Sequence, residues 1–180
     1  MRVTIIEYKK LKNIDLTLNK FTVLIGQNHT GKSTFLEYLS HQFKNAKYFD
    51  NIPDFPPINP SKDPKVIQSL LSLIKTVTPN TLLLLRNPEK GIHPKLHGQI
   101  VEILKTAPST TVISTYSPYL LDHVNIEDVL IFHRENEDIK ITPMRKVKGI
   151  EDYLGEYLLG ELWFNWGEEE LIRRSTLQLS

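Results

Sequence analysis

The chain of 180 residues contains no cysteine. That absence excludes disulfide bonds, thiolate metal sites and cysteine nucleophiles, and it fits a reducing compartment. Long apolar runs are also missing, because none approaches the roughly 18 residues that a membrane span requires. The opening sequence MRVTIIEYKK lacks the apolar core of a secretory signal. We therefore expect a soluble, cytoplasmic protein without a membrane partner.

The sequence also lacks an excess of either positive or negative charge. The formal net charge is +1, so the overall balance gives no electrostatic reason to expect binding to nucleic acid or a membrane. The hydrophobic content of 40% and the charged content of 24% are ordinary for a globular protein. A chain of this length suits one domain with a real core and hardly two. We expect a single domain over residues 1–180.

Short apolar stretches with strand composition alternate with segments that have apolar residues at helical spacing. This pattern predicts an α/β fold with a mostly parallel sheet. Residues 14–18 alternate apolar and polar side chains before a turn, which predicts a hairpin with the buried strand that follows. Strands are expected at 2–8, 14–18, 21–26, 46–49, 82–85, 109–115, 128–134 and 138–144, and helices at 31–43, 65–77, 93–107 and 117–124.

Two further segments have distinctive compositions. Residues 50–64 contain five prolines, too many for a helix or a central strand, and indicate a surface excursion within the domain. Residues 150–180 form an apolar, aromatic tail with helical stretches. Its aromatic side chains either dock a partner or cover the sheet edge as core, and both readings stay open. They are Tyr153, Tyr157, Trp163, Phe164 and Trp166.

The sequence GQNHTGKST, residues 26–34, fits the phosphate-loop pattern G-x-x-x-x-G-K-[ST]. It follows an apolar strand and opens an amphipathic helix, whose positive dipole end favours an anion. In this pattern Lys32 reaches the β- and γ-phosphates and the Ser33 hydroxyl ligates Mg²⁺. The alternatives are a glycine-rich turn that binds nothing and a loop that has lost its nucleotide. The expected nucleotide-binding residues are Gly26, Gln27, Asn28, His29, Thr30, Gly31, Lys32, Ser33 and Thr34.

Two later stretches accompany the loop, LLLLRNPEKGIHP at 82–94 and ISTYSPYLLD at 113–122, and a GELW stretch lies at 160–163. Together and in this order they resemble the ABC-type ATPases of the RecF, SMC and OLD kind, in the small versions usually described as AAA-family ATPases. The family's motifs read G-x-N-x-x-G-K-S-T, D-E-P-E-x-x-L-H-P and T-H-S-P. The resemblance implies a P-loop NTPase fold: an ABC-type nucleotide-binding core with N-terminal antiparallel strands and flanking helices. It also implies ATP as ligand.

The chain departs from the family at the residues that carry the chemistry. Arg86 stands where the family has the Asp that positions Mg²⁺; it cannot ligate a cation, but it could contact phosphates directly. Asn87 replaces the water-activating Glu and cannot accept a proton. Tyr116 stands where the family has a His that contacts the γ-phosphate; its hydroxyl could donate one hydrogen bond there, but it cannot carry a positive charge near neutral pH. Nearby Glu89 is a substitute base or, in the reading that we favour, a packing or dimer contact.

The family's signature loop and its lid are also altered. Counting back from the second motif places the signature at PSKDPK, where Ser61 is kept and Asp63 replaces a glycine. An Asp there would face a partner's γ-phosphate, which is electrostatically unfavourable. Little chain separates the phosphate loop from the second motif, so the lid or arm insertion is reduced to the proline-rich loop 50–64.

Two other candidates carry less weight. His93 and His97 lie four residues apart and would share a helix face, but a metal site lacks a third ligand of suitable spacing. Ser117 has no evident base, so it does not indicate a nucleophile. Neither candidate changes the expectation set by the three motifs.

These observations predict an ATP-binding protein with impaired hydrolysis, in which nucleotide is a structural ligand or a gate on assembly. Arg86 and Tyr116 join the nucleotide-binding set. One alternative is a slow ATPase in a partner complex, with Mg²⁺ held by Ser33 and the phosphates and with Asn87 or Glu89 handling the water. The other is a nucleotide-free scaffold. The resemblance implies a homodimer, or a hetero-oligomer with another ATPase subunit or an effector; DNA enters by family analogy only.

Overall fold

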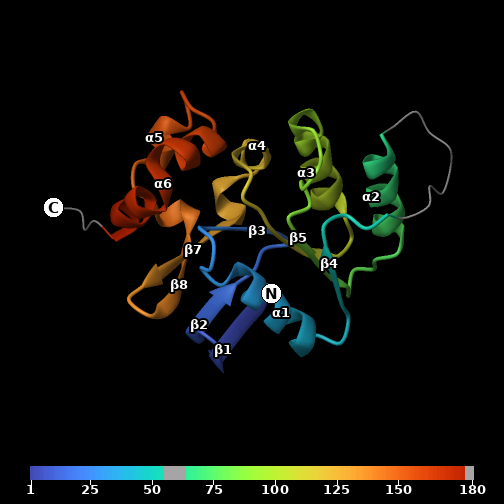
Figure 1. Ribbon diagram of the computed structural model, residues 1–180, viewed down its shortest axis with the longest axis horizontal. Coiled ribbons are helices and arrows are strands. Elements are labelled where there is room, and N and C mark those ends of the chain that lie inside the picture. The colour runs from blue at the N-terminus through green and yellow to red at the C-terminus, as the bar shows by residue number, and fades with distance from the viewer. Residues whose placement is uncertain (55–63, 177–180) are drawn as a thin grey trace.

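The computed structural model describes residues 1–54 and 64–176. Its strands form one eight-stranded sheet in the order β1-β2-β8-β7-β3-β6-β5-β4 (Figure 1). The strands are β1 (Arg2–Tyr8), β2 (Leu11–Thr17), β3 (Phe21–Ile25), β4 (Ala46–Asp50), β5 (Leu82–Arg86), β6 (Thr110–Ser114), β7 (Val129–Glu135) and β8 (Asp138–Pro143).

Helices surround the sheet and mostly match the expected segments. The predicted helix at 93–107 begins as a 3-10 turn, with Pro94 at its first position. The α-helices are α1 (Lys32–Gln42), α2 (Lys65–Lys75), α3 (His97–Thr106), α4 (Pro118–Leu121), α5 (Ile150–Tyr153) and α6 (Leu159–Thr176). The 3-10 helices are η1 (Pro94–Leu96), η2 (Ile126–Asp128) and η3 (Met144–Lys146).

The strand pairings confirm the predicted α/β class. Strands β7, β3, β6, β5 and β4, adjacent in that order, run parallel to one another and form the P-loop NTPase core. Antiparallel pairing joins β1 to β2 at the N-terminus and β7 to β8. A single parallel pair, Leu11 with Ile139, links β2 to β8.

The predicted hairpin between residues 14–18 and 21–26 is wrong. Strand β2 pairs with β1 instead, and β3 lies between β6 and β7. The burial pattern explains this outcome, because every residue of β3 is buried whereas most of β2 is exposed or half-buried. A strand buried throughout needs neighbours on both sides and cover on both faces, which an edge hairpin cannot supply.

Each face of the sheet has its own apolar core. Leu83 and Leu85 of β5 face the core formed with α2, α3, α4 and α6, whereas Leu82 and Leu84 face α1 and the β1–β2 hairpin. Figure 1 shows α1 on the side of β1 and β2, and the other helices on the opposite side. Because both faces are covered, this strand reads as a continuous apolar run and not as an alternating one.

The C-terminal tail contains α5 and α6, and α6 is broken at Gly167 (φ 69°, ψ 177°). Trp163 and Trp166 pack against the core, whereas Phe164 is 77% exposed. Of the two readings of the aromatic tail, the one in which its side chains belong to the core therefore applies to Trp163 and Trp166. Residues 177–180 lie outside the described part of the chain.

Of the proline-rich segment 50–64, residues 55–63 lie outside the described part, and with them both signature residues, Ser61 and Asp63. In residues 1–54 and 64–176 we find no helix with the length and apolar character needed to cross a membrane.

Candidate nucleotide-binding site

The phosphate loop connects β3 to α1 and depends on two glycines. Gly26 and Gly31 have φ values of 142° and 95°, a region that glycine adopts far more readily than other residues. A Cβ atom on Gly26 would collide with the carbonyl oxygen of Phe132, and one on Gly31 with the side chain of Ile139. The two glycines thus let the loop pack tightly against β7 and β8 while its backbone curves.

Lys32 is folded back onto the loop that precedes it. Its Nζ donates hydrogen bonds to the carbonyl oxygens of Gly26 (2.7 Å) and Gln27 (2.8 Å) and lies 4.2 Å from the centre of the Tyr116 ring. The residue is only 3% exposed. Burial lowers the pKa of Lys32 to about 8, and the nearby Glu168 carboxylate opposes that shift. An anion in the loop would find this ammonium already desolvated.

A cleft of about 570 Å³ opens over the loop, within the size range of ligand sites. It is lined by every predicted nucleotide-binding residue except Gly26 and Gln27. Five basic side chains line it and, in the described part of the chain, no acidic one does. They are Lys9, Lys10, Lys32, Arg86 and Arg134. The positive charge of the cleft lining therefore favours the binding of a polyanion.

Arg86 ends β5 beside Asp50, the last residue of β4. One guanidinium NH₂ donates to Asp50 Oδ2 at 3.0 Å, and Nε lies 2.8 Å from Oδ1. The Asp50 carboxylate beside this strand end is thus paired with an arginine. Arg86 also lines the cleft over the phosphate loop.

The two candidate catalytic residues, Asn87 and Glu89, lie outside the lining of the cleft. Glu89 Oε1 accepts hydrogen bonds from the Thr115 hydroxyl (2.7 Å) and the Tyr116 N–H (3.3 Å), so it ties the turn after β5 to the end of β6. Glu89 Oε2 and Asn87 Oδ1 are buried without a hydrogen-bond partner. Two buried acceptors without partners at one strand end are a suitable place for a water molecule that donates a hydrogen bond to each of them.

The groups that line the cleft are better suited to bind ATP than to bind Mg²⁺. Backbone N–H groups and the Lys and Arg side chains suit a triphosphate, whereas the cleft lining offers a metal neutral oxygens, such as the Ser33 hydroxyl and the Asn28 amide, and no carboxylate. In the described residues no group of three His, Asp or Glu side chains could hold a metal ion. Any Mg²⁺ would rely on the phosphates for its remaining ligands.

His93 and His97 do not share a helix face. His93 is exposed and caps η1, its Nδ1 accepting from the Lys95 N–H at 3.2 Å. His97 is buried, and its Nε2 lies 3.3 Å from the Ile92 carbonyl oxygen. Its Nδ1 lies 3.5 Å from the Ser117 hydroxyl, so Ser117 does have an imidazole neighbour, at a distance too long for a strong hydrogen bond.

Sequence reasoning missed four residues around the loop. Lys9 and Lys10 reach the cleft from the turn between β1 and β2, and Arg134 from β7, with its Nε donating to the His29 carbonyl oxygen at 3.1 Å. Glu168 accepts a hydrogen bond from the Gln27 N–H. The acidic run directly after Gly167 was a signal for a helix start there, but nothing local linked it to the loop.

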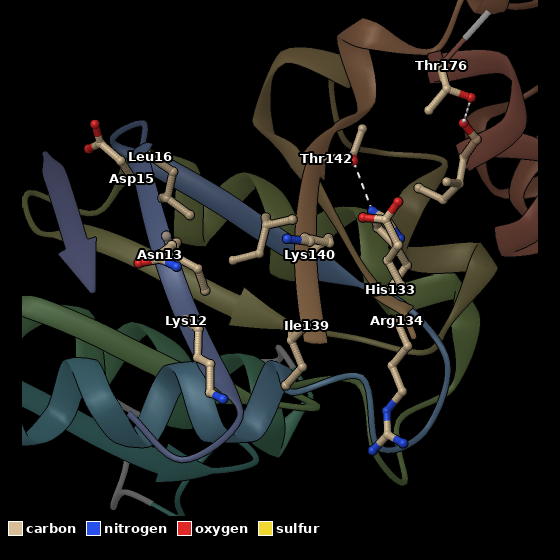
Figure 2. Close-up of a pocket in the computed structure, with 14 residues that line it drawn as sticks. Lys12, Asn13, Asp15, Leu16, His133, Arg134, Ile139, Lys140, Thr142 and Thr176 are labelled. Carbon is tan, nitrogen blue, oxygen red and sulfur yellow. Dashed lines mark hydrogen bonds between the residues drawn. The ribbon is translucent and has the colours of Figure 1, made fainter. Parts of the chain in front are cut away.

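A second hollow of about 420 Å³ lies where β2 and β8 diverge beyond the pair Leu11–Ile139 (Figure 2). Arg134 borders both hollows, but this one mixes acidic and basic side chains, including Asp15, Glu135 and Lys140. It lacks the single-sign charge and the loop backbone of the cleft. We therefore place the candidate site at the phosphate loop.

Comparison with known families agrees with this geometry. Residues 1–70 match the model of the AAA ATPase domain, and residues 67–152 match that of a family described as Protein of unknown function (DUF2813). No curated protein matches the chain. The first match includes the phosphate loop, and the second includes the ends of β5 and β6. The two matches confirm the resemblance to small AAA-type ATPases of the RecF, SMC and OLD kind.

Proposed function

We propose that this small AAA-type P-loop protein binds ATP in its basic cleft without depending on Mg²⁺, and hydrolyses it slowly or not at all. The observation that carries the proposal is the position of Arg86. It lines the same cleft as the phosphate loop, at the strand end where a carboxylate would hold the metal. A guanidinium there repels a cation and attracts phosphate oxygens.

Charge neutralisation by the protein supports metal-independent binding. Lys32 and Arg134 are fixed at the loop by hydrogen bonds to its carbonyl oxygens, and Arg86 faces the same space. Arg86 already shares its charge with Asp50, but that ion pair is exposed and contributes little by itself. The guanidinium can therefore turn toward a triphosphate at small cost. The protein's cations would then do much of what Mg²⁺ does in complete sites.

Impaired hydrolysis is supported by the absence of a carboxylate from the described lining of the cleft. A general base must lie within hydrogen-bond reach of the attacking water, directly or through one water. Glu89 is the nearest carboxylate in the motif, but its Oε1 is engaged by Thr115 and Tyr116. Asn87 can orient a water and cannot take its proton.

Nucleotide would then act as a structural ligand or as a gate on assembly. The partner would be a second copy, another ATPase subunit or an effector. Tyr116 lines the cleft and is 45% exposed, and Tyr119 on the following helix is 59% exposed. A partner that covers the cleft would bury the Tyr116 ring together with the nucleotide. A role for DNA rests on family analogy alone.

Calorimetric titration with ATP tests the proposal, in Mg²⁺ and in EDTA. The dissociation constants in the two buffers are expected to agree within about threefold. Lys32→Ala should weaken binding at least about tenfold, because it removes a charge-assisted contact. Lys75→Ala, at the exposed end of α2, is the matched control and should bind normally. A strict requirement for Mg²⁺ would contradict the proposal, and no binding at millimolar ATP by folded protein would favour the nucleotide-free scaffold.

One observation favours a second function, slow hydrolysis in a partner complex. The orphan acceptors Asn87 Oδ1 and Glu89 Oε2 lie two residues apart at the end of β5. A water held there would have the free oxygen of a carboxylate beside it. A partner that rearranges this turn could bring that water toward the cleft.

A further inference from the structure

A hollow of about 420 Å³ lies between α4 and the start of α6, lined by residues within 118–122 and 160–165. It shares no lining residue with the nucleotide cleft, and we call it the α4–α6 groove. The two helices pack closely here, because a Cβ atom on Gly160 would collide with the Pro118 carbonyl oxygen. The Gly160 N–H also donates to Asp122 Oδ1 at 2.8 Å. The walls of the groove are therefore held together before any ligand binds.

Two aromatic rings line the groove and are left largely exposed. Tyr119 on α4 is 59% exposed, and Phe164 on α6 is 77% exposed. The residues just before Phe164 behave differently, since Leu162 is buried and Trp163 packs against the core. Exposed aromatic side chains beside a hollow are typical of sites where proteins bind one another. The two rings therefore mark the groove as a candidate docking surface.

The charge of the groove is of one sign. Asp122 and Glu161 are the charged residues of its described lining, which contains no basic side chain. Glu161 Oε2 accepts a hydrogen bond from the Leu158 N–H at 2.9 Å. Neither carboxylate forms an ion pair with another described residue. Such a surface repels phosphate groups, so nucleic acid and anionic lipid are poor occupants, and a cation is a good one.

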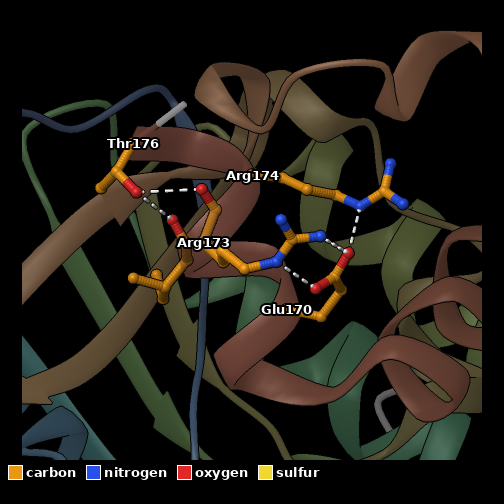
Figure 3. A network of polar contacts seen from close by, with 5 residues as sticks. Glu170, Arg173, Arg174 and Thr176 are labelled. Carbon is orange, nitrogen blue, oxygen red and sulfur yellow. Dashed lines mark hydrogen bonds and ion pairs between the residues drawn. The ribbon is translucent and has the colours of Figure 1, made fainter. Parts of the chain in front are cut away.

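The second part of α6 shows how this chain holds a cation with the same kinds of group. Glu170 accepts hydrogen bonds from Arg173 and Arg174, at 2.7 Å in each case (Figure 3). The Arg174 guanidinium also lies 4.1 Å from the centre of the Trp166 ring and 5.4 Å from that of Tyr153. One carboxylate and two aromatic rings thus contact a single arginine. The α4–α6 groove has two carboxylates and two rings, but its described lining supplies no cation.

We propose that the α4–α6 groove docks a partner protein through an arginine side chain that apolar residues flank. The guanidinium would lie against the Tyr119 and Phe164 rings and pair with the Glu161 carboxylate. This docking surface goes beyond the nucleotide site, and only its link to assembly rests on the function proposed above. That link is the short segment from Tyr116, which lines the cleft, to Tyr119, which lines the groove.

The test uses two capped tripeptides, one with arginine between two leucines and one with citrulline, its neutral isostere, in the same place. Titration of the ¹⁵N-labelled full chain without ATP should shift the amide signals of Tyr119, Gly160 and Phe164. The arginine peptide should bind at least about fivefold tighter than the citrulline peptide.

Three variants locate the interaction. Phe164→Ala removes an exposed ring and should weaken binding of the arginine peptide at least about fivefold. Glu161→Gln keeps an acceptor for the Leu158 N–H and should bring the two peptides to within about twofold of each other. Glu169→Gln removes a charge from an exposed position outside the groove and should match the wild type.

Several results would overturn the docking surface. They are equal affinities of the wild type for both peptides, signal shifts confined to other parts of the chain, and no shift at millimolar arginine peptide. A wild-type dimer that dissociates in Phe164→Ala, measured by sedimentation velocity, would assign the groove to a second copy and not to a separate partner. Because the titrations contain no nucleotide, a failure to bind ATP would overturn the proposed function and leave a measured peptide preference standing.

Discussion

Asp50 and Arg86 end two neighbouring parallel strands in register and form an ion pair at the edge of the cleft. Replacing Arg86 with Asp would place two carboxylates at this edge. Like charges at close range repel, and a divalent cation would relieve the repulsion. In the variant Arg86→Asp we therefore expect ATP binding to become dependent on Mg²⁺, with a much larger difference between Mg²⁺ and EDTA titrations than in the wild type.

Adding Asn87→Glu to that variant supplies a base beside the restored metal position. A positioned base contributes roughly 10²- to 10⁴-fold to a rate, so turnover measured by phosphate release should rise at least about tenfold. Arg86→Asp alone serves as the control for the metal effect. If the double variant binds Mg²⁺ and ATP yet shows no gain, further parts of the hydrolytic machinery are missing from the chain.

Lys32 makes ATP binding sensitive to pH near 8. Its pKa in the free protein is about 8, and the groups that face it are the carbonyl oxygens of Gly26 and Gln27, the Thr30 hydroxyl, the Tyr116 ring and Glu168. A bound polyanion stabilises the ammonium and raises this pKa. Binding at pH 8 should therefore take up roughly half a proton, and affinity should fall as pH rises through 8.

Calorimetry in two buffers of different ionisation enthalpy measures this uptake. Lys32→Arg is the matched variant, because a guanidinium stays protonated in this range. It should lose the proton uptake even if its affinity is lower. Uptake of the same size in both proteins would assign the proton to another group.

Substitutions of Glu89 distinguish a structural role of this residue from a catalytic one. Its Oε1 holds Thr115 and Tyr116, so Glu89→Ala should leave two donors without their acceptor and lower the free energy of unfolding by roughly 1–3 kcal/mol. Glu89→Gln keeps an acceptor and should cost less. Urea unfolding gives both values.

Measuring ATP turnover by the same variants then decides between the two roles of Glu89. A purely structural Glu89 predicts that any residual turnover survives in Glu89→Gln in proportion to folded protein. A base predicts that turnover disappears in Glu89→Gln while stability and ATP affinity are kept, which would favour the slow-ATPase function.

The site was predictable where its determinants are local or topological. The phosphate loop is a contiguous motif between an apolar strand and an amphipathic helix, and these elements formed as expected. Arg86 and Tyr116 reach the same cleft because β5, β6 and β3 run parallel and end at one edge of the sheet. Alternating strands and helices were enough to predict that arrangement.

The remaining residues depend on contacts that no local pattern records. Lys9 and Lys10 border the cleft only because β2 pairs with β1 and not with β3. Asn87 adopts a positive φ of 51°, which the linear motif does not record, and it lies outside the cleft lining. The position of Glu168 depends on a break in a helix far along the chain.

The single backbone pair between Leu11 and Ile139 has a thermal consequence. The hairpin that carries Lys9 and Lys10 is attached to the rest of the molecule mainly by buried apolar side chains, among them Val3, Ile5 and Ile14. Apolar attachment weakens on cooling, whereas a hydrogen-bonded parallel sheet depends on it less. The wall of the cleft that bears two of its five cations is therefore the part of the site most easily loosened by cold.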